Sequence, residues 1–333
     1  MHERILMRVA GAFTCLLGMT SLPFMPAAQA QTVTLRVVSA FPTPLATNDM
    51  LRELVKRVDQ ESGGKIKINY LGGPEVITAP DQAQAIRTGV IDLLYGAANY
   101  YQGVVPEGDA IIASGKKPWE ARANGGWKLL QDVHAKKMGT YLLGWPGANF
   151  PFYIYLRDTP KLAANGIPDL SNLKIRTTPI YREFLTAMNA TPVVIQIPEV
   201  YTSLERGLVN GVGFPINTLP NLGWNKHLKY RISPGFFTGD LMLNANLAKW
   251  NSLPKDSRDL IEKIMQDVER LSYDFYDKLD KQDDEVMRKG GMEVLTLSPE
   301  AGKRYVAMAN QVVWDRLIKN SPVDGPKLKA LFE

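Results

Sequence analysis

The feature that most constrains the fold is a pattern that occurs twice in the chain. The two copies are residues 79–99 and 197–217. Pro80 aligns with Pro198 and Gly89 with Gly207, a constant offset of 118 residues (198 − 80 and 207 − 89). Proline suits the first turn of a helix and glycine the position after its last turn, so each copy predicts a helix that leads into a strand. Such units also recur by chance, but a constant offset over this length favours true repetition, and hence two similar α/β halves.

Each half also contains a strand that ends at a loop. Residues 35–39 form a β-rich run, residues 48–61 follow with helical apolar spacing, and residues 65–70 alternate polar with apolar side chains. This β-α-β order predicts a parallel sheet, and residues 173–177 resemble the first strand. Because ligands of open α/β sheets bind beyond the carboxyl ends of the strands, two facing lobes would place both sets of loops around one cleft.

The length of the chain agrees with two lobes, because 333 residues exceed what a single core usually spans. Residues 254–289 have apolar side chains at helical spacing and charged side chains elsewhere. A helix or helix pair of this length could brace both lobes. The alternative is an ordinary surface helix.

The N-terminus predicts export. Arg4 and Arg8 precede an apolar stretch over residues 9–22, and Ala28-Gln29-Ala30 has the small-x-small pattern of a signal-peptidase site. The alternative is a membrane anchor, but the stretch is shorter than the roughly 20 residues that span a bilayer. We therefore expect residues 1–30 to be a signal peptide cleaved near Ala30, and the mature protein to be exported.

Composition and motifs argue against several classes of function. The net charge of +5 is mild and the basic residues lie among acids, so nucleic-acid binding is not expected. The only cysteine, Cys15, lies in the leader, and His134 and His227 fit no metal-binding pattern. No nucleophile, metal site or cofactor motif is evident. We expect no catalytic residue, no metal, no cofactor and no enzymatic activity.

Arg176 is the strongest candidate for ligand binding. It lies at the end of an apolar strand, where a guanidinium would be partly buried and costly unless paired. The planar fork of donors matches a carboxylate, and each charge-assisted hydrogen bond contributes about 1.5–3 kcal/mol. The alternative is a structural salt bridge, which is the commoner role of an arginine.

The middle of the chain resembles the solute receptors of tripartite ATP-independent periplasmic (TRAP) transporters. The resemblance lies in Asp-Leu-x-x-Leu-Lys-Ile-Arg at residues 169–176, and in residues 189–193, 199–207 and 209–211. It extends through residues 63–66, 89–92 and 250–254 and so covers most of the expected mature chain.

The resemblance implies a periplasmic binding protein of type II-like α/β fold, with two lobes, a central ligand cleft and a long bridging helix. It implies that Arg176 forms a salt bridge to the ligand carboxylate, and that the lobes close around the ligand like a hinged trap. The partners would be a small organic acid and the integral membrane subunits of the transporter, with a monomeric receptor. An ion gradient supplies the energy in this family, so no nucleotide is expected. We expect one lobe to comprise residues 31–154 and about 239–278, and the other residues 155–238 and about 279–333.

Some positions depart from the family pattern. Asn210 stands where an aspartate is usual, and Phe214 where a residue before the proline is often polar, so Phe214 predicts an apolar or aromatic wall. A second ligand-facing arginine often precedes the first by about twenty residues. Leu156 occupies that position here, which leaves Arg157 or Tyr153 as substitutes.

Aromatic residues gather at the expected loop ends, and core packing should account for half or more of them. The remainder would favour a monocarboxylate with an apolar or aromatic body, or a 2-oxo acid, over a sugar acid. The expected ligand-binding residues are Arg176, Phe214, Asn217, Phe41, Tyr100, Phe152, Tyr153, Asn149, Arg157 and Phe237. A ligand-binding sensor subunit is the alternative function, and a secreted hydrolase is a further one.

Overall fold

The computed structural model describes residues 32–333, so the expected signal peptide lies outside the described residues. The first part of the chain builds a five-stranded sheet with the order β2-β1-β3-β12-β4. Its strands are β1 (Val33–Ser39), β2 (Ile66–Gly72), β3 (Leu93–Ala97), β4 (Thr140–Gly147) and β12 (Leu241–Asn246). β1 pairs in parallel with β2 and β3, and β12 runs antiparallel to both of its neighbours. The parallel β-α-β unit predicted at the N-terminus is confirmed.

The second sheet has six strands with the order β13-β11-β5-β10-β8-β9. They are β5 (Phe152–Leu156), β8 (Lys174–Thr177), β9 (Thr191–Val194), β10 (Gly211–Pro215), β11 (Tyr230–Ser233) and β13 (Glu293–Thr296). β8 pairs in parallel with β9 and β10, while β5 runs antiparallel to β10. A short pair, β6 (Lys161–Leu162) and β7 (Pro168–Asp169), stands apart from both sheets.

The repeat found in the sequence is present in the two sheets. β3 and β10 have the same length and begin at Leu93 and Gly211, which keeps the offset of 118 residues (211 − 93). Val37 pairs with Leu93 in one sheet and Ile175 with Gly211 in the other, so the strand register matches as well.

In both halves, the side chain just before the strand fixes the turn that leads into it. The Asp92 carboxylate accepts the backbone N–H of Arg36 at 2.8 Å, and Asn210 Oδ1 accepts the backbone N–H of Lys174 at 2.9 Å. Each contact closes the turn from the preceding helix onto the neighbouring strand. Gly89 and Gly207 make the turns possible, because their φ angles of +76° and +67° favour glycine.

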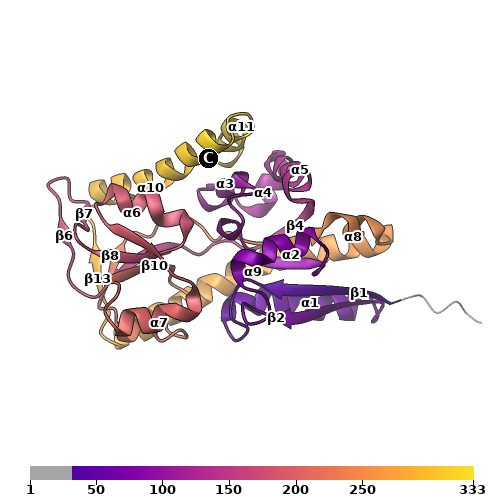
Figure 1. Ribbon diagram of the computed structural model, residues 1–333, viewed down its shortest axis with the longest axis horizontal. Helices are drawn as coiled ribbons and strands as arrows, with labels where there is room; N and C mark the ends of the chain where they lie inside the picture. Colours follow the sequence, from indigo (N-terminus) through magenta and orange to yellow (C-terminus); the bar gives the residue numbers. More distant parts are fainter. Residues whose placement is uncertain (1–31) are drawn as a thin grey trace, which may run out of the picture. The chain divides into compact units, whose positions relative to one another are not determined.

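Helices cover the two sheets and connect them (Figure 1). They are α1 (Asp49–Glu61), α2 (Gln82–Arg87), α3 (Asp109–Ile112), α4 (Pro118–Ala123), α5 (Gly126–Met138), α6 (Arg182–Ala187), α7 (Ile197–Glu205), α8 (Leu247–Ser252), α9 (Lys255–Lys289), α10 (Pro299–Asn320) and α11 (Gly325–Phe332).

The long helix α9 contacts both lobes, as predicted. Its N-terminal half packs on α1 and β4 beside the five-stranded sheet. Its C-terminal half meets the other lobe, where Asp283 accepts the backbone N–H of Thr218 at 2.7 Å and Asp284 pairs with Arg231 at 2.7 Å. At 35 residues it is about 50 Å long, long enough to reach across both lobes.

The chain crosses between the sheets three times: between β4 and β5, between β11 and β12, and between β12 and β13 by way of α8 and α9. β5 and β12 join their new sheets in antiparallel orientation, whereas β13 pairs in parallel with β11. The expected division counts all residues from 279 onward with the second lobe, whereas α11 packs on α3 and α5 of the first. The residue limits of the lobes stay a prediction.

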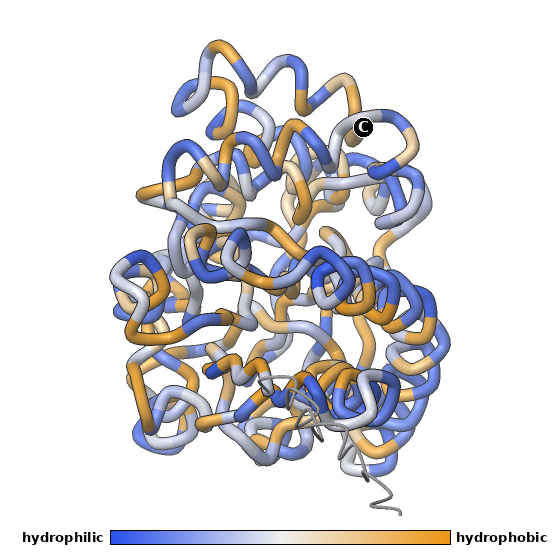
Figure 2. Tube along the Cα trace, turned by 90° about the vertical axis from the view of Figure 1, so that its right-hand side faces the viewer, coloured by the Kyte–Doolittle hydropathy of each residue, from blue (hydrophilic) through white to orange (hydrophobic). Residues whose placement is uncertain are grey.

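Apolar side chains fill both lobes and the region between them. Figure 2 shows hydrophilic and hydrophobic residues alternating along the helices, as expected for elements that bury one face. Within residues 32–333, none of the helices combines the length and hydropathy that a bilayer-spanning segment requires.

Candidate functional site

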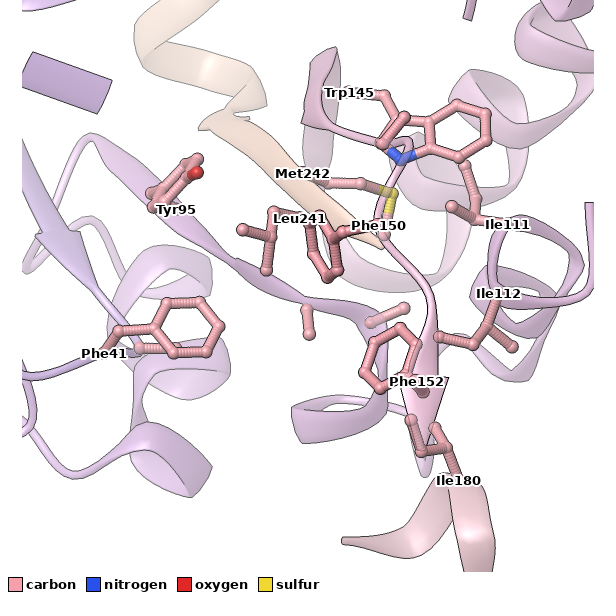
Figure 3. Close-up of a cluster of buried hydrophobic side chains, with 14 of the residues drawn as sticks. Phe41, Tyr95, Ile111, Ile112, Trp145, Phe150, Phe152, Ile180, Leu241 and Met242 are labelled. Atoms are coloured by element: carbon pink, nitrogen blue, oxygen red, sulfur yellow. The ribbon is translucent and has the colours of Figure 1, made fainter. Parts of the chain in front are cut away.

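A cavity lies where the carboxyl ends of the central strands of the two sheets meet. Its volume is about 40 Å³, whereas one water requires about 10–15 Å³ by the same measure. It is lined by Phe41, Thr47, Ala97, Asn99, Tyr100, Phe150, Phe152, Arg176, Thr178, Ile180, Tyr181, Ile197, Phe214, Pro215, Asp240 and Leu241. The set combines residues from both lobes, with apolar side chains in the majority. Figure 3 shows Phe41 on one side of this region and Phe152 with Ile180 on the other.

The backbone of the second lobe fixes the Arg176 guanidinium at the cavity. Arg176 lies on β8, where it pairs in register with Val193 of β9 and Val212 of β10. Its Nε donates to the carbonyl of Ile195 at 2.9 Å, and its Nη1 donates to the carbonyl of Gly213 at 3.3 Å. These bonds occupy two of the five N–H donors of the guanidinium, and both acceptors are neutral carbonyls.

Arg176 is buried with an exposed fraction of 1%. Trp224 and Phe214 lie beside its guanidinium, with ring centroids 5.4 Å and 5.9 Å from Cζ. Across residues 32–333, no carboxylate forms a salt bridge with it. Burial lowers the pKa of Arg176, which is the expected response of a cation removed from water. The site therefore holds a desolvated positive charge that an anion would stabilise.

Two tyrosines complete the surroundings of the guanidinium. Burial raises the pKa of Tyr100 and of Tyr181, and the charge of Arg176 opposes that shift in both. Both phenols are thus neutral at physiological pH and can donate a hydrogen bond to an anion. Tyr100 packs edge-on against Phe41 and Tyr181 against Phe152, so each phenol ring has an aromatic neighbour.

Four cavity-lining side chains each have an oxygen that lacks a hydrogen-bond partner among the described residues. These atoms are Thr47 Oγ1, Asn99 Oδ1, Thr178 Oγ1 and Asp240 Oδ2. A buried polar atom without a partner costs about 1–3 kcal/mol, and such atoms are uncommon in folded proteins. A polar ligand in the cavity would supply partners for these atoms.

The family is shown by comparison with known proteins. A family profile described as "Bacterial extracellular solute-binding protein, family 7" matches residues 157–320. The chain belongs to the TRAP solute-binding protein family. TRAP solute-binding proteins are periplasmic, bind small organic acids and work with membrane subunits; the family is one of transport proteins.

Relatives of this TRAP solute-binding protein cover nearly its whole length. It is 22% identical over 314 residues to the monocarboxylate 2-oxoacid-binding periplasmic protein of Nostoc sp., covering 90% of this chain and 82% of that protein. The fold matches that of a Bordetella pertussis extracytoplasmic solute receptor binding pyroglutamic acid (TM-score 0.77, 18% identity, 90% and 99% coverage). It also matches a Desulfovibrio salexigens TRAP periplasmic solute-binding protein with bound orotic acid (TM-score 0.79, 18% identity, 90% and 97% coverage). The predicted two-lobed type II-like fold is confirmed.

The structure brings half of the expected ligand-binding residues of this TRAP protein to the cavity. Those that line it are Arg176, Phe214, Phe41, Tyr100 and Phe152. They come from both lobes and from segments more than a hundred residues apart in the sequence.

The other five expected residues do not line the cavity. Asn217 donates to Asp280 at 2.9 Å, and exposed Asn149 donates to the carbonyl of Tyr273 at 3.2 Å. Arg157 donates a hydrogen bond to the carbonyl of Leu204, and the ring of Tyr153 stacks on the guanidinium of Arg231. Phe237 packs against Phe152 and Tyr181. The substitutes for a second arginine at positions 153 and 157 therefore already have partners within the protein.

Sequence reasoning missed several polar and aromatic residues of the cavity. Thr178 follows Arg176 by two positions, and the alternation of a strand could have suggested that both face the same side. Asn99 stands at the repeat position of Asn217, but only Asn99 lines the cavity. For Asp240 and Tyr181 the sequence carried no comparable signal.

No cluster of three or more His, Cys, Asp or Glu side chains that could hold a metal ion occurs between residues 32 and 333. His134, one of the two histidines in this range, is buried with its Nδ1 2.7 Å from the carbonyl of Leu130. Burial lowers the pKa of His134 to about 4, so it is neutral at physiological pH.

Proposed function

We propose that this protein is the periplasmic solute receptor of a TRAP transporter for a small organic carboxylate, and that Arg176 binds the carboxylate as a salt bridge. The observation that carries the proposal is the buried guanidinium of Arg176, which lines the cavity and has no carboxylate partner within residues 32–333. An arginine in that state loses hydration without gaining an ion pair. A ligand carboxylate would supply the missing charge and accept the free N–H groups in a bidentate geometry.

The cavity favours a small acid with an apolar body. Its walls are mainly aromatic and aliphatic, whereas a hydroxylated sugar acid needs hydrogen-bond partners along its whole length. The named ligand class of the Nostoc relative, a monocarboxylate 2-oxoacid, has suitable size and polarity. We therefore propose a monocarboxylate, and among these an aromatic or aliphatic acid or a 2-oxo acid.

The lobes are proposed to close around this acid. The cavity wall combines Phe41 and Tyr100 of one lobe with Arg176 and Phe214 of the other. A ligand that contacts both lobes binds the closed form more tightly than the open form and shifts the hinge equilibrium by that difference in affinity. The closed, monomeric receptor would then deliver the acid to the membrane subunits.

The test is a thermal-shift screen of the purified protein against a library of small carboxylic acids, followed by calorimetry, because a ligand that binds only the folded state raises the melting temperature. Arg176→Ala should weaken binding of any hit by roughly a hundredfold, the effect expected when charge-assisted hydrogen bonds are lost. Arg176→Lys should recover part of the affinity, since lysine keeps the charge but not the planar fork.

Arg157→Ala is the matched control, because Arg157 is half-buried and its guanidinium bonds Leu204 away from the cavity. It should keep the wild-type affinity. Arg176→Ala removes a buried charge without an ion-pair partner but also the hydrogen bonds to Ile195 and Gly213, so the melting temperature of the unliganded variant is measured first to establish that it is folded. Acid binding that survives in Arg176→Ala would refute the salt bridge, and the absence of any acid hit would refute the proposed receptor function.

A further inference from the structure

Asp240 is the second ionisable group buried in the cavity wall. It directly precedes β12, its exposed fraction is 2%, and its side chain lines the same cavity as Arg176. Its Oδ2 has no hydrogen-bond partner among the described residues. The loop that carries it is fixed by Trp145, whose Nε1 donates to the carbonyl of Gly239 at 2.7 Å. Asp240 is therefore a buried carboxyl group whose free oxygen belongs to the wall of the ligand site.

Asp240 and Arg176 do not form an ion pair with each other. The charges of both nevertheless act on the phenols of Tyr100 and Tyr181, so these two hydroxyls lie within electrostatic range of both groups. The cavity thus has a cation at one part of its wall and an acid at another. A ligand whose carboxylate is bound by Arg176 needs a second polar atom to form a hydrogen bond with Asp240.

The charges of the ligand carboxylate, Arg176 and Asp240 determine whether the second polar atom of the ligand donates or accepts this hydrogen bond. A ligand carboxylate at Arg176 neutralises the buried cation, and a second negative charge on Asp240 would then stand uncompensated in the same enclosed site. Protonation removes that charge and converts the side chain into a hydrogen-bond donor. We propose that Asp240 contacts the ligand as a neutral acid and donates a hydrogen bond to an oxygen other than the carboxylate at Arg176, so that ligand binding takes up a proton.

The titration behaviour of Asp240 agrees with this geometry. Burial raises the pKa of Asp240 to about 7, although hydrogen bonds from Asn99 and from backbone N–H groups oppose the shift. Among the groups that face it, burial raises the pKa of Tyr100, of Tyr101 and of Tyr181, so none of these phenols ionises near pH 7.

Asp109 and His134 are the other titratable groups near Asp240. Asp109 raises the pKa of Asp240 by its charge, and Asp109 itself is held by Arg316 at 2.8 Å. His134 has its Nε2 3.4 Å from the hydroxyl of Tyr101, and burial lowers the pKa of His134 to about 4. Asp240 is therefore the ionisable group of the cavity wall with a pKa near neutral pH. The proton comes from solvent and binds to the Asp240 carboxylate, and no other covalent bond forms or breaks.

The inference names the ligand class more closely and rests on the proposed function, because it assumes an anion at Arg176. A neutral carboxyl donor requires an acceptor such as the oxygen of an oxo group. Acids that carry an oxo group should therefore bind better than acids of the same length without one, by about tenfold for one hydrogen bond in a buried site.

The first experiment measures Kd against pH for 2-oxopentanoate and 4-oxopentanoate. Affinity should be constant below about pH 6 and should fall as pH rises above about 7, by up to tenfold per pH unit. The reason is that Asp240 of the unliganded protein is ionised above its pKa, so that ligand binding must then take a proton from solvent. Titration calorimetry at pH 7 in two buffers of different ionisation enthalpy should show net proton uptake.

Asp240→Asn keeps a hydrogen-bond donor that cannot ionise, so it should bind the oxo acids with a flat pH profile and no proton uptake. Asp280→Asn is the matched control. Burial also raises the pKa of Asp280 to about 7, but Asp280 bonds Asn217 and does not line the cavity. The Asp280→Asn variant should keep the wild-type pH profile and proton uptake.

The second experiment compares the two oxo acids with pentanoate. Wild type and Asp240→Asn should prefer at least one oxo acid about tenfold, and Asp240→Leu should lose that preference while still binding pentanoate. A pH profile that is unchanged in Asp240→Asn, an oxo preference that persists in Asp240→Leu, or proton release on binding would overturn the inference.

These results separate the inference from the proposed function. Binding that depends on Arg176 but not on Asp240 overturns only the role of Asp240. If none of the three acids binds, or if binding is independent of Arg176, the proposed function fails for this ligand class and the inference fails with it.

Discussion

Asp92 and Asn210 perform the same structural task in the two halves of the protein with different chemistry. Each side chain accepts a backbone N–H of the neighbouring strand, from Arg36 and Lys174 respectively. Asp92 also binds the Arg36 guanidinium, with Nε at 2.9 Å from Oδ2. The asparagine at position 210 therefore preserves the hydrogen bond to the strand without an ion pair.

This difference leads to a prediction about acid stability. Burial by itself would raise the pKa of Asp92, but the hydrogen bonds from Arg36 outweigh burial and hold that pKa below its ordinary value. A carboxylate with a lowered pKa stabilises the fold above its unfolded pKa of about 3.9, and the contribution is lost as pH falls through the folded pKa. Asp92→Asn should reduce the acid sensitivity of the free energy of unfolding, measured by urea denaturation between about pH 3 and pH 6. The same acid sensitivity in wild type and variant would contradict the prediction.

At the scale of elements, the close approach of α9 to β4 depends on Gly144. A Cβ at this position would overlap the side chain of Met265, which is fully buried. Glu269, one turn further along α9, accepts the backbone N–H of Trp145 at 2.7 Å and a hydrogen bond from Arg122 at 2.6 Å. The helix is thus held against the strand by a buried carboxylate and cannot retreat without breaking these bonds.

Gly144→Ala should therefore lower the free energy of unfolding by about 2 kcal/mol, the usual cost of overpacking a core. Met265→Ala should destabilise through a cavity, and the double variant should lose less than the sum of the two single losses because the added methyl group occupies space that methionine vacates. Gly103→Ala is the control, since a Cβ at Gly103 meets no atom within 4 Å. Strictly additive losses in urea denaturation would contradict this account of the contact.

At the scale of the whole molecule, Arg316 of α10 connects the two lobes. Its guanidinium binds Asp109 of α3 on the first lobe and Glu183 of α6 on the second. Asp109 is almost fully buried, whereas Glu183 is half-exposed. Breaking one partner of a buried pair typically costs 3–5 kcal/mol because it leaves an uncompensated charge.

Arg316→Met should thus lower the free energy of unfolding by about 3 kcal/mol, and Asp109→Asn combined with Arg316→Met should recover part of that loss. Because the contact spans both lobes, we also expect Arg316→Met to enlarge the radius of gyration of the unliganded protein in small-angle scattering. An unchanged radius of gyration would show that Arg316 does not help to hold the lobes together.

The sequence by itself determined the features that depend on local order along the chain. The repeated proline-to-glycine spacing predicted two equivalent helix-to-strand units, and the structure keeps both the offset and the strand register. It also placed Arg176 at the carboxyl end of a strand, because an arginine in an apolar run that ends in a loop has few other positions in an α/β fold. The family followed from the motif around that arginine.

The tertiary structure alone decided which side chains meet. The antiparallel entry of β5 and β12 into opposite sheets depends on pairing between strands far apart in the sequence, and no local pattern encodes such partners. For the same reason Phe41 and Phe214 reach the cavity while Tyr153 stacks on Arg231 elsewhere. Asp240 could not be singled out in the sequence, because its burial and its unpaired oxygen result from the packing of segments from both lobes.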